Sequence, residues 1–403
     1  MTPPAATSTA TEPTPPLGGV LGRACAKVYG SLVQLRNGWY DVNPGRKIDR
    51  PVVSVGNLSV GGTGKTPMVV HLVRMLKAAG RTPAIAMRGY ASPTGSPADS
   101  DEAQQYLRAL PGIALAVGKD RLGELKEMFT TRRGKVVDCV VLDDGFQHRQ
   151  LWRDVDLVLI DATRSPFEDR LLPSGWLRER VEGLSRASGV IITHAESAAP
   201  GTVDRLAAEV QRITGKGPVA VCRHEWRALV TGEGQQERTL PADFLKGRRV
   251  VVSCAIGNPG PFLSRARAGG EVVGTQILRD HDPYAETTVR ELADLARTSK
   301  VDAILVTEKD WSKLRQRPPE TFPCPVLRPR LELGFLSGER AVEDLVVGCT
   351  APFGEQSRAA HVVLEMAVST IDDDVASGEM VGQCHHRRVG DLARRDHDPC
   401  HAR

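Results

Sequence analysis

The chain of 403 residues is long enough for two domains with separate hydrophobic cores. Its composition, 41% hydrophobic and 25% charged, is typical of a globular protein, and a formal net charge of +4 is too small to indicate nucleic-acid binding. The eight cysteines form no Cys-x-x-Cys pair and several lie in apolar runs, which favours buried thiols in a reducing compartment over disulfides.

Residues 1–19 are rich in Pro, Thr and Ala and contain neither Lys nor Arg. They lack the basic start and apolar core of a signal peptide, so we expect a disordered leader. No stretch of the chain approaches about 18 consecutive apolar residues, and we expect no membrane-spanning helix.

Residues 20–48 form an N-terminal region in which residues 20–36 have the spacing of an amphipathic helix. Polar residues occupy one face of the helical wheel, and the opposite face consists of Leu21, Ala24, Cys25, Val28, Leu32 and Leu35. This pattern leaves two interpretations open. The apolar face packs on the core of the domain, or it lies on a membrane surface with basic residues toward the headgroups.

Residues 51–67 are typical of a phosphate-binding loop between a strand and a helix. Val52, Val53 and Val55 are expected in a buried strand, and apolar residues at helical spacing begin at Met68. The segment between them, compared with the pattern G-x-x-x-x-G-K-[ST], consists of Ser59, Val60, Gly61, Gly62, Thr63, Gly64, Lys65 and Thr66.

The residue types in this loop predict nucleotide binding. Glycines let backbone N–H groups approach an anion closely, and the helix N-terminus adds partial positive charge. Lys65 is expected to reach the outer phosphates, and the Thr66 hydroxyl is expected to ligate Mg²⁺. Ser59 stands where the general pattern has its first glycine. The alternative is a glycine turn that only joins a strand to a helix, and the strand and helix around the loop disfavour it.

A second strand is expected over residues 82–87, and a helix is expected to begin after Ser100. Asp101 and Glu102 stand in the first turn of that helix, where carboxylates interact favourably with the helix dipole. On local grounds, helix capping is therefore favoured over a chemical role for both acids.

Residues 136–144 have the apolar character of a buried parallel strand and end in Asp143 and Asp144. Ligand sites lie at the carboxyl ends of such strands, so these acids are expected to hold Mg²⁺ opposite Thr66. The alternative is a strand end in a solvated turn.

Strands over residues 155–160 and 190–193 flank a loop that carries Arg178 and Glu179. Because strands alternate with helices, residues 49–215 are expected to form a P-loop domain. Its fold class is α/β, with a mostly parallel sheet that has helices on both faces.

Residues 216–350 are expected to form a second, smaller α/β domain. Its expected elements are an extended connector at 219–227, strands at 250–255, 272–278 and 303–306, and a helix at 285–298.

Two later segments give weaker signals. Residues 307–310, Thr-Glu-Lys-Asp, match the guanine-reading motif Asn-Lys-x-Asp poorly, because the Asn is missing and the Lys is displaced. Guanine recognition is therefore disfavoured. Residues 351–403 lose the alternation of strands and helices, and we expect a disordered tail. The His and Cys residues of this tail match no zinc pattern, so a metal site there is the less favoured alternative.

Several motifs together point to a family. In chain order they are Val-Gly-Asn-Leu-Ser-Val-Gly-Gly-Thr-Gly-Lys-Thr-Pro, Met-Arg-Gly-Tyr, Ser-Asp-Glu, Asp-Asp-Gly-Phe-Gln-His, Leu-Pro-Ser-Gly-Trp-Leu-Arg-Glu, Ala-Ile-Gly-Asn-Pro, Asp-His-Asp and Thr-Glu-Lys-Asp. Over roughly residues 20–350 the sequence resembles the tetraacyldisaccharide 4′-kinase family of lipid A biosynthesis. The resemblance implies transfer of the ATP γ-phosphoryl group to the 4′-hydroxyl of a tetraacylated glucosamine disaccharide 1-phosphate, which gives lipid IVA.

The resemblance also implies roles for individual residues. Asp101 and His281 match the acid and the histidine of the family's proposed base pair, which reverses the local preference for a capping role of Asp101. Because this pair spans both expected domains, domain closure would assemble it. Lys65 would serve the phosphates, and Mg²⁺ would be held by Thr66, Asp143 and Asp144. Further matching residues are Glu102, Gln147, His148, Arg178 and Glu179.

The family resemblance implies a peripheral protein at the cytoplasmic face of the inner membrane. Its lipid acceptor needs an apolar landing surface, which favours the membrane interpretation of residues 20–36. We expect no nucleic-acid partner and no obligate protein partner. Two alternatives remain, namely a P-loop kinase with a soluble acceptor and a nucleotide-gated switch.

Overall fold

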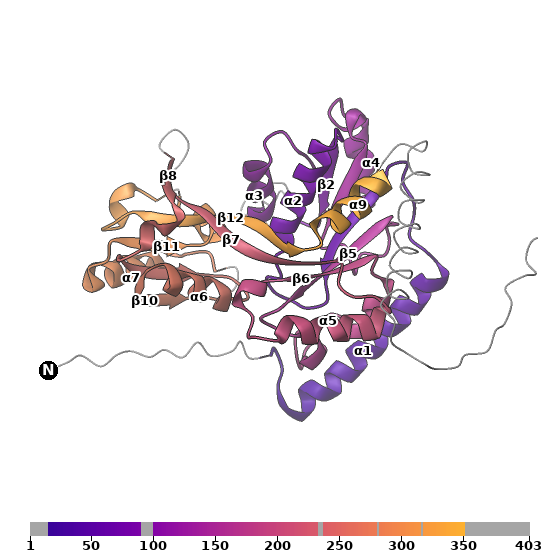
Figure 1. Ribbon diagram of the computed structural model, residues 1–403, viewed down its shortest axis with the longest axis horizontal. Coiled ribbons are helices and arrows are strands. Elements are labelled where there is room, and N and C mark those ends of the chain that lie inside the picture. Colours follow the sequence, from indigo (N-terminus) through magenta and orange to yellow (C-terminus); the bar gives the residue numbers. More distant parts are fainter. Residues whose placement is uncertain (1–14, 90–99, 233–236, 280–281, 316, 351–403) are drawn as a thin grey trace, which may run out of the picture. The chain divides into compact units, whose positions relative to one another are not determined.

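The computed structural model describes residues 15–89, 100–232, 237–279, 282–315 and 317–350. All of them belong to one compact unit, Met1–Pro352 (Figure 1). The expected tail at 351–403, its His and Cys residues, and most of the expected leader lie outside the described residues, so these expectations stay predictions.

Twelve strands form one sheet (Figure 1). Their bounds are Val52–Asn57 (β1), Pro83–Met87 (β2), Ala114–Val117 (β3), Cys139–Asp143 (β4), Val155–Asp161 (β5), Gly189–Thr193 (β6), Ala220–Thr231 (β7), Arg238–Pro241 (β8), Arg249–Cys254 (β9), Glu271–Ile277 (β10), Ala303–Val306 (β11) and Val326–Ser337 (β12). The strand order is β10-β9-β11-β12-β7-β6-β5-β1-β4-β2-β3, and β8 pairs with β7. The pairs of β7 with β12 and with β8 are antiparallel, and the other pairs are parallel.

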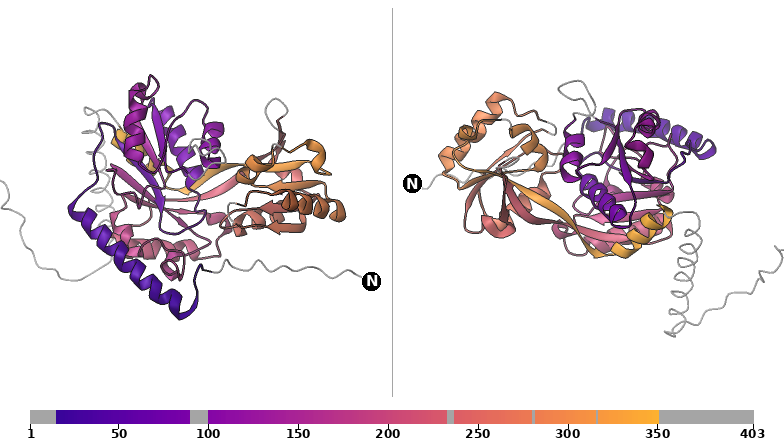
Figure 2. Two further views of the ribbon diagram at one scale, coloured as in Figure 1. Left: turned by 180° about the vertical axis from the view of Figure 1, so that it is seen from behind. Right: turned by 90° about the horizontal axis from the view of Figure 1, so that it is seen from above.

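Helices cover both faces of this sheet (Figure 2). The described α-helices are Gly19–Val42 (α1), Lys65–Ala78 (α2), Asp101–Ala109 (α3), Arg121–Thr130 (α4), Thr202–Thr214 (α5), Gly260–Gly269 (α6), Glu286–Ser299 (α7), Glu308–Leu314 (α8) and Glu339–Thr350 (α9). The expected α/β fold class is therefore confirmed.

Strand β1 shows how the sequence produces this layered arrangement. All six of its residues are buried. Val53 and Val55 pack in one hydrophobic cluster with Leu72 of α2, and Val52 packs in another cluster with Leu125 of α4. Because side chains alternate along a strand, a buried run of valines indicates a strand with helices on both sides.

Most of residues 219–227, which were expected to form an extended connector, belong to the long strand β7. Arg223 and Arg227 are exposed, while Cys222, His224 and Trp226 are buried. This alternation is the period of a half-buried strand. Strand β7 pairs with β12, which no sequence signal predicted.

These two long strands carry the sheet through both expected domains. Ala220 and Cys222 of β7 pack in the same hydrophobic cluster as Val53 of β1. Trp226 and Leu229, farther along β7, pack in a different cluster that also contains Leu305 of β11. The division into residues 49–215 and 216–350 stays a prediction.

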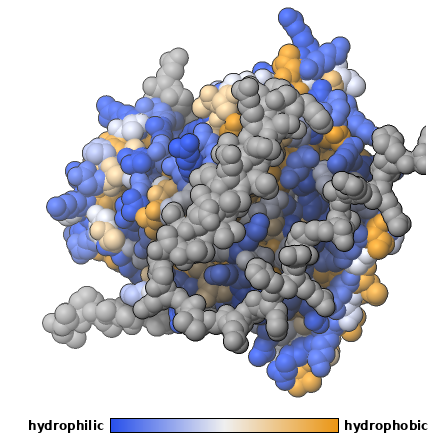
Figure 3. Space-filling view, turned by 45° about the vertical axis from the view of Figure 1, so that its right-hand side comes forward, coloured by the Kyte–Doolittle hydropathy of each residue, from blue (hydrophilic) through white to orange (hydrophobic). Residues whose placement is uncertain are grey.

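The structure contains the expected helix as α1, and its orientation excludes one of the two interpretations of its apolar face. Leu21, Val28, Leu32 and Leu35 are 60–72% exposed, so packing of this face on the core is wrong. The buried residues of the helix are instead Gly22, Ala26 and Gly30. The space-filling view likewise shows hydrophobic residues at the surface among hydrophilic ones (Figure 3). Within the described part of the chain, no helix meets the length and hydropathy needed to cross a membrane.

Candidate functional site

The phosphate loop lies at the carboxyl end of β1, between β1 and α2. Gly64 adopts a left-handed conformation with φ of 81° and directly precedes Lys65, the first residue of α2. The Thr193 hydroxyl at the end of β6 donates a hydrogen bond of 3.0 Å to the Thr63 carbonyl. The Val60 backbone N–H donates to the Trp176 carbonyl at 2.8 Å. Neighbouring strands and loops therefore hold the loop open toward the N-terminus of α2, which suits an anion.

Lys65 is held between the end of β1 and the end of β4. Its Nζ atom lies 3.1 Å from Asn57 Oδ1 and 3.5 Å from Asp144 Oδ1. Arg178 reaches the same carboxylate, with Nη1 at 2.7 Å and 2.8 Å from the two Asp144 oxygens. Although burial raises the pKa of Asp144, the charges of Lys65 and Arg178 outweigh it and hold that pKa below its usual value.

Asp143 lies in a different environment from Asp144. Its Oδ2 accepts a hydrogen bond of 3.0 Å from the Tyr106 hydroxyl, which also contacts the Thr66 side chain. Its Oδ1 is buried and has no hydrogen-bond partner among the described residues. Burial, followed by repulsion from Asp144, raises the pKa of Asp143. The Tyr106 hydroxyl thus contacts both Asp143 and Thr66. The Thr66 hydroxyl and the unpartnered Asp143 oxygen are the kinds of oxygen ligand that Mg²⁺ prefers.

Glu102 adds a third carboxylate to the same region. It lines the same cavity as Asp143 and Asp144, and its pKa is raised to about 7, first by burial and then by the charge of Asp143. The charge of Lys309 acts in the opposite direction. Four carboxylate or ammonium groups from α3, β4 and the start of α8 therefore influence one another across this cavity.

The expected base pair is only partly described. Ser100 caps α3 as predicted, since its hydroxyl accepts from the Ala103 N–H at 3.4 Å, and Asp101 is the first residue of that helix. The side chain of Asp101 and the whole of His281 lie outside what the structure describes. The pairing of these two residues stays a prediction.

Glu179 and Gln147 form a network that connects the site to α1. Gln147 Nε2 donates to the Asn57 carbonyl and to Glu179 Oε1, both at 2.9 Å. The nearly fully buried Glu179 also accepts from Arg186 at 2.6 Å and from Asn37 of α1 at 3.1 Å. Glu179 is therefore a buried anion with several donors that orients Gln147 beside the strand end.

His148, another residue expected in the site, does not line the cavity. Burial, with the charges of Arg121 and Arg153, lowers the pKa of His148 to about 4. A role for His148 in the metal and phosphate site stays a prediction.

A cavity of about 370 Å³ brings these groups together. The phosphate loop, Glu102, Asp143, Asp144 and Arg178 line one side, and residues from the second part of the chain complete it, including Trp226, Ile256, Asn258, Phe262, Thr307, Glu308 and Lys309. Its volume is in the range of small-ligand pockets, and it combines an apolar wall with a charged one. This combination suits a nucleotide, which has an apolar base and charged phosphates.

Sequence reasoning missed several residues of this cavity. Trp226 and Phe262 belong to no motif, and aromatic residues in strands and helices are usually core residues.

Asp310, in the segment compared with the guanine-reading motif, is fully buried, and its carboxylate accepts from the Ala255 N–H at 3.2 Å. It also accepts from Thr307, the N-cap of α8, so Asp310 supports local structure.

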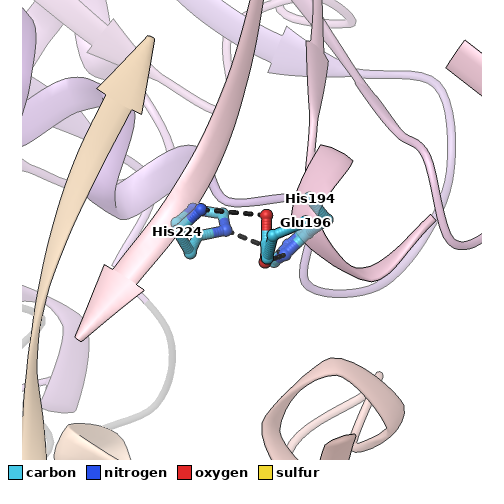
Figure 4. A group of neighbouring side chains, drawn as sticks. All are labelled: His194, Glu196 and His224. Atoms are coloured by element: carbon cyan, nitrogen blue, oxygen red, sulfur yellow. Dashed lines mark hydrogen bonds and ion pairs between the residues drawn. The ribbon is translucent and has the colours of Figure 1, made fainter. Parts of the chain in front are cut away.

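A group of two histidines and a glutamate also lines the cavity beside the phosphate loop (Figure 4). His194 follows β6, Glu196 lies in the short helix Ala195–Ser197, and His224 belongs to β7. The two Nδ1 atoms are 2.8 Å apart, and His194 Nδ1 lies 3.6 Å from Glu196 Oε1. A Cβ atom on Gly64 would lie 2.8 Å from His224 Nε2, so only glycine fits beside this ring.

Comparisons with known proteins show the family of the chain. A family model described as tetraacyldisaccharide-1-P 4′-kinase matches residues 20–346. The tetraacyldisaccharide 4′-kinase of Anaeromyxobacter dehalogenans strain 2CP-C is 35% identical over 319 residues, which are 74% of this chain and 83% of that protein. The protein of the same name from Chlorobaculum parvum is 34% identical over 317 residues, which are 73% of this chain and 84% of the relative.

A solved structure agrees as well. LpxK from Aquifex aeolicus in complex with ATP matches with a TM-score of 0.59 at 26% identity, and the match covers 81% of this chain and 98% of the other. The phosphate loop, both aspartates at the end of β4 and all of α1 except Gly19 lie within residues 20–346. The chain belongs to the tetraacyldisaccharide 4′-kinase family.

Proposed function

We propose that this protein transfers the γ-phosphoryl group of ATP to the 4′-hydroxyl of a tetraacyldisaccharide 1-phosphate, giving lipid IVA. The observation that carries the proposal is the convergence of Lys65, Thr66 and the paired acids Asp143 and Asp144 on one cavity beside a phosphate loop. Membership of the kinase family supplies the acceptor. Phosphoryl transfer asks a protein mainly for positioning and for neutralisation of charge, and this cavity offers both.

Each charged residue has a distinct task in this proposal. Lys65 and the loop N–H groups stabilise the charge that develops on the transferred phosphoryl group. Thr66, Asp143 and Asp144 would hold Mg²⁺, which would supply positive charge to neutralise the phosphates. Arg178 keeps Asp144 ionised and in place through its two short contacts.

The acceptor hydroxyl needs a base, and we assign this task to Asp101 and His281. An Asp that accepts a hydrogen bond from a His orients the ring and raises its basicity. Asp101 begins the same helix as Glu102, which lines the cavity. Closure of the second part over the first would bring the pair to the acceptor.

The acyl chains of the acceptor require an apolar surface, and α1 provides one. Its exposed residues include Val28, Leu32, Leu35 and Trp39, which are 57–72% exposed. An amphipathic helix of this kind binds at the boundary between headgroups and acyl chains. We therefore propose that the protein works peripherally at the cytoplasmic face of the inner membrane.

Transfer from labelled ATP tests the proposal. The purified chain with Mg²⁺ is given two acceptors in detergent micelles, a tetraacyldisaccharide 1-phosphate and the same lipid already phosphorylated at the 4′ position. We expect label on the first acceptor only. Tight ATP binding without any lipid product would keep the nucleotide site and refute the acceptor, which would favour a kinase with a soluble acceptor.

A further inference from the structure

The group formed by His194, Glu196 and His224 has no task in the mechanism above, although all three residues line the nucleotide cavity (Figure 4). His194 also forms a hydrogen bond with the Gly62 backbone in the phosphate loop. Two strand-linked histidines are thus fixed against the loop that is expected to hold the phosphates.

The contacts determine where the protons lie. Two imidazole nitrogens 2.8 Å apart share one proton, so one Nδ1 atom donates and the other accepts. His194 is the donor, because its Nδ1 also faces the Glu196 carboxylate at 3.6 Å and a backbone group of Gly62 lies beside the ring. The other oxygen of Glu196 accepts from the backbone N–H of His224 at 3.1 Å, which fixes the carboxylate.

The electrostatics agree with this assignment. Burial lowers the pKa of His194, but the hydrogen bond to Glu196 and the charge of Asp161 outweigh burial and raise it. Burial, followed by the charge of His194, lowers the pKa of His224 to about 3. The surroundings of the pair therefore favour the charged form of His194 and the neutral form of His224.

A neutral His224 that accepts at Nδ1 carries its proton on Nε2. His224 is only 8% exposed, and its Nε2 has no hydrogen-bond partner in the part of the chain that the structure describes. This nitrogen faces the loop, since a Cβ atom on Gly64 would lie 2.8 Å away from it. A buried N–H without an acceptor costs about 1–3 kcal/mol, so such groups usually have a ligand or water as partner.

We propose that His224 Nε2–H donates a hydrogen bond to a phosphate oxygen of the bound nucleotide, and that Glu196 and His194 fix the tautomer that makes this possible. The proposal rests on the nucleotide site proposed above and adds a phosphate-binding residue that is separate from Lys65. An anion suits this position because the loop N–H groups and the N-terminus of α2 favour negative charge, and the raised pKa of His194 acts in the same direction.

The competing possibility is a cation site. The ligand atoms of the three residues all lie within 4.8 Å of one another, as in a site with two histidines and a glutamate. A metal ion bound through both Nδ1 atoms would need a lone pair on each of them, whereas the shared proton uses one of them. The two possibilities differ in what the protein binds, so a binding experiment separates them.

Calorimetric titration of the full chain with MgATP and with adenosine, without a lipid acceptor, tests the proposal. His224→Phe removes the donor but keeps a ring of similar size, and we expect it to weaken ATP binding by about tenfold or more. Adenosine affinity should stay unchanged, because adenosine has no phosphate. His224→Gln places an amide N–H near the position of Nε2, and its ATP affinity should stay within about threefold of the wild type.

His71→Phe is the matched control. His71 lies on α2 and does not line the cavity. Its buried Nε2 makes no hydrogen bond among the described residues and lies 3.7 Å from Glu339 Oε1. Its ATP affinity should match the wild type.

Three results would overturn the proposal. They are unchanged ATP affinity in His224→Phe, an equal loss of ATP and adenosine affinity, and stoichiometric binding of Zn²⁺ to the nucleotide-free wild type that His224→Phe abolishes. Absence of lipid phosphorylation would refute the acceptor only and would leave this result unaffected.

Discussion

The phosphate loop and helix α1 differ in where their side chains find partners. In the loop region, Lys65 contacts Asn57 and Asp144, and Asp144 forms an ion pair with Arg178. The Thr63 carbonyl accepts a hydrogen bond from Thr193. On α1, a row of large apolar side chains faces solvent. The difference indicates that the loop is organised before its ligand arrives, whereas the large apolar side chains of α1 are left exposed by the residues that the structure describes.

The two regions are connected through the polar side of α1. Tyr29 donates a hydrogen bond to the Arg178 carbonyl at 2.8 Å, and Asn37 donates to Glu179 at 3.1 Å. Glu179 in turn holds Gln147 beside Asn57. The helix that we propose to meet lipid on one side therefore contacts the phosphate-loop end of the sheet on the other, which would place an acyl-chain surface next to the phosphate site.

The largest expected effect comes from the loop. Lys65→Ala should lower the turnover of lipid phosphorylation by on the order of 10³-fold, because the charge on the transferred group loses its main protein cation. Labelled-ATP assays in micelles give the number. Lys126→Ala, at an exposed position of α4, is the control and should keep full turnover. Retained turnover in a folded Lys65→Ala protein would refute the loop assignment.

A smaller loss is expected from the glycine before Lys65. Gly64→Ala should weaken ATP binding by about tenfold to a hundredfold, because φ of 81° strains any other residue and its Cβ would meet the His224 ring. Gly80→Ala isolates the strain, since Gly80 has φ of 77° and open space around it. That control should lose about 1 kcal/mol of unfolding free energy without a change in ATP affinity. Equal ATP affinity in both variants would contradict the predicted contact.

The apolar side of α1 can be removed without disturbing the loop. The triple variant Val28→Ser, Leu32→Ser and Leu35→Ser should lower kcat/KM for the lipid acceptor by about tenfold or more, because each side chain buries apolar surface in the membrane. Thermal stability and ATP affinity should stay unchanged, since these side chains are exposed. Val136→Ser makes the same kind of change at an exposed apolar residue elsewhere and is the control. A triple variant that matches it in vesicle binding and kinetics would refute the membrane role.

The smallest expected effect concerns pH. Because the pKa of Glu102 is raised to about 7 in the folded chain, the folded state binds more protons there than the unfolded state at mildly acidic pH. The stabilisation that the proton on Glu102 contributes is therefore fully present below the pKa that Glu102 has in the unfolded chain, and it is lost as pH rises through about 7. Without Mg²⁺, the wild-type Tm should fall between pH 5 and pH 8 more than the Tm of Glu102→Gln. Identical pH profiles would show that Glu102 titrates normally.

Local patterns predicted the loop and the acids well, because their signals lie within a few residues. The run from Val52 to Thr66 contains its own strand, turn and helix start, and Asp143 follows from a buried strand end. Sequence did not predict β12 or Trp226 as a cavity residue, since both depend on pairing between segments about 100 residues apart. His194 and His224 meet only because β6 and β7 are neighbours in the sheet.

The orientation of α1 shows a different limit. A helical wheel identifies two faces but does not say which one contacts the protein. Here the contact is made by Gly22, Ala26 and Gly30, a row of small residues that lets the backbone approach the domain closely. Their spacing of four residues was a usable signal in the sequence, and it would have directed the large apolar residues toward solvent.

The most direct test of the account is the acceptor preference of the enzyme. The measurement is the ratio of kcat/KM for the tetraacylated disaccharide 1-phosphate to that for its fully deacylated form, in the wild type and in the α1 triple variant. The account predicts a strong preference for the acylated acceptor in the wild type. In the variant the ratio should fall, because activity on the acylated acceptor decreases while activity on the deacylated one stays the same. Equal activity on both acceptors in the wild type would contradict a lipid kinase and would identify a kinase that acts on a soluble sugar.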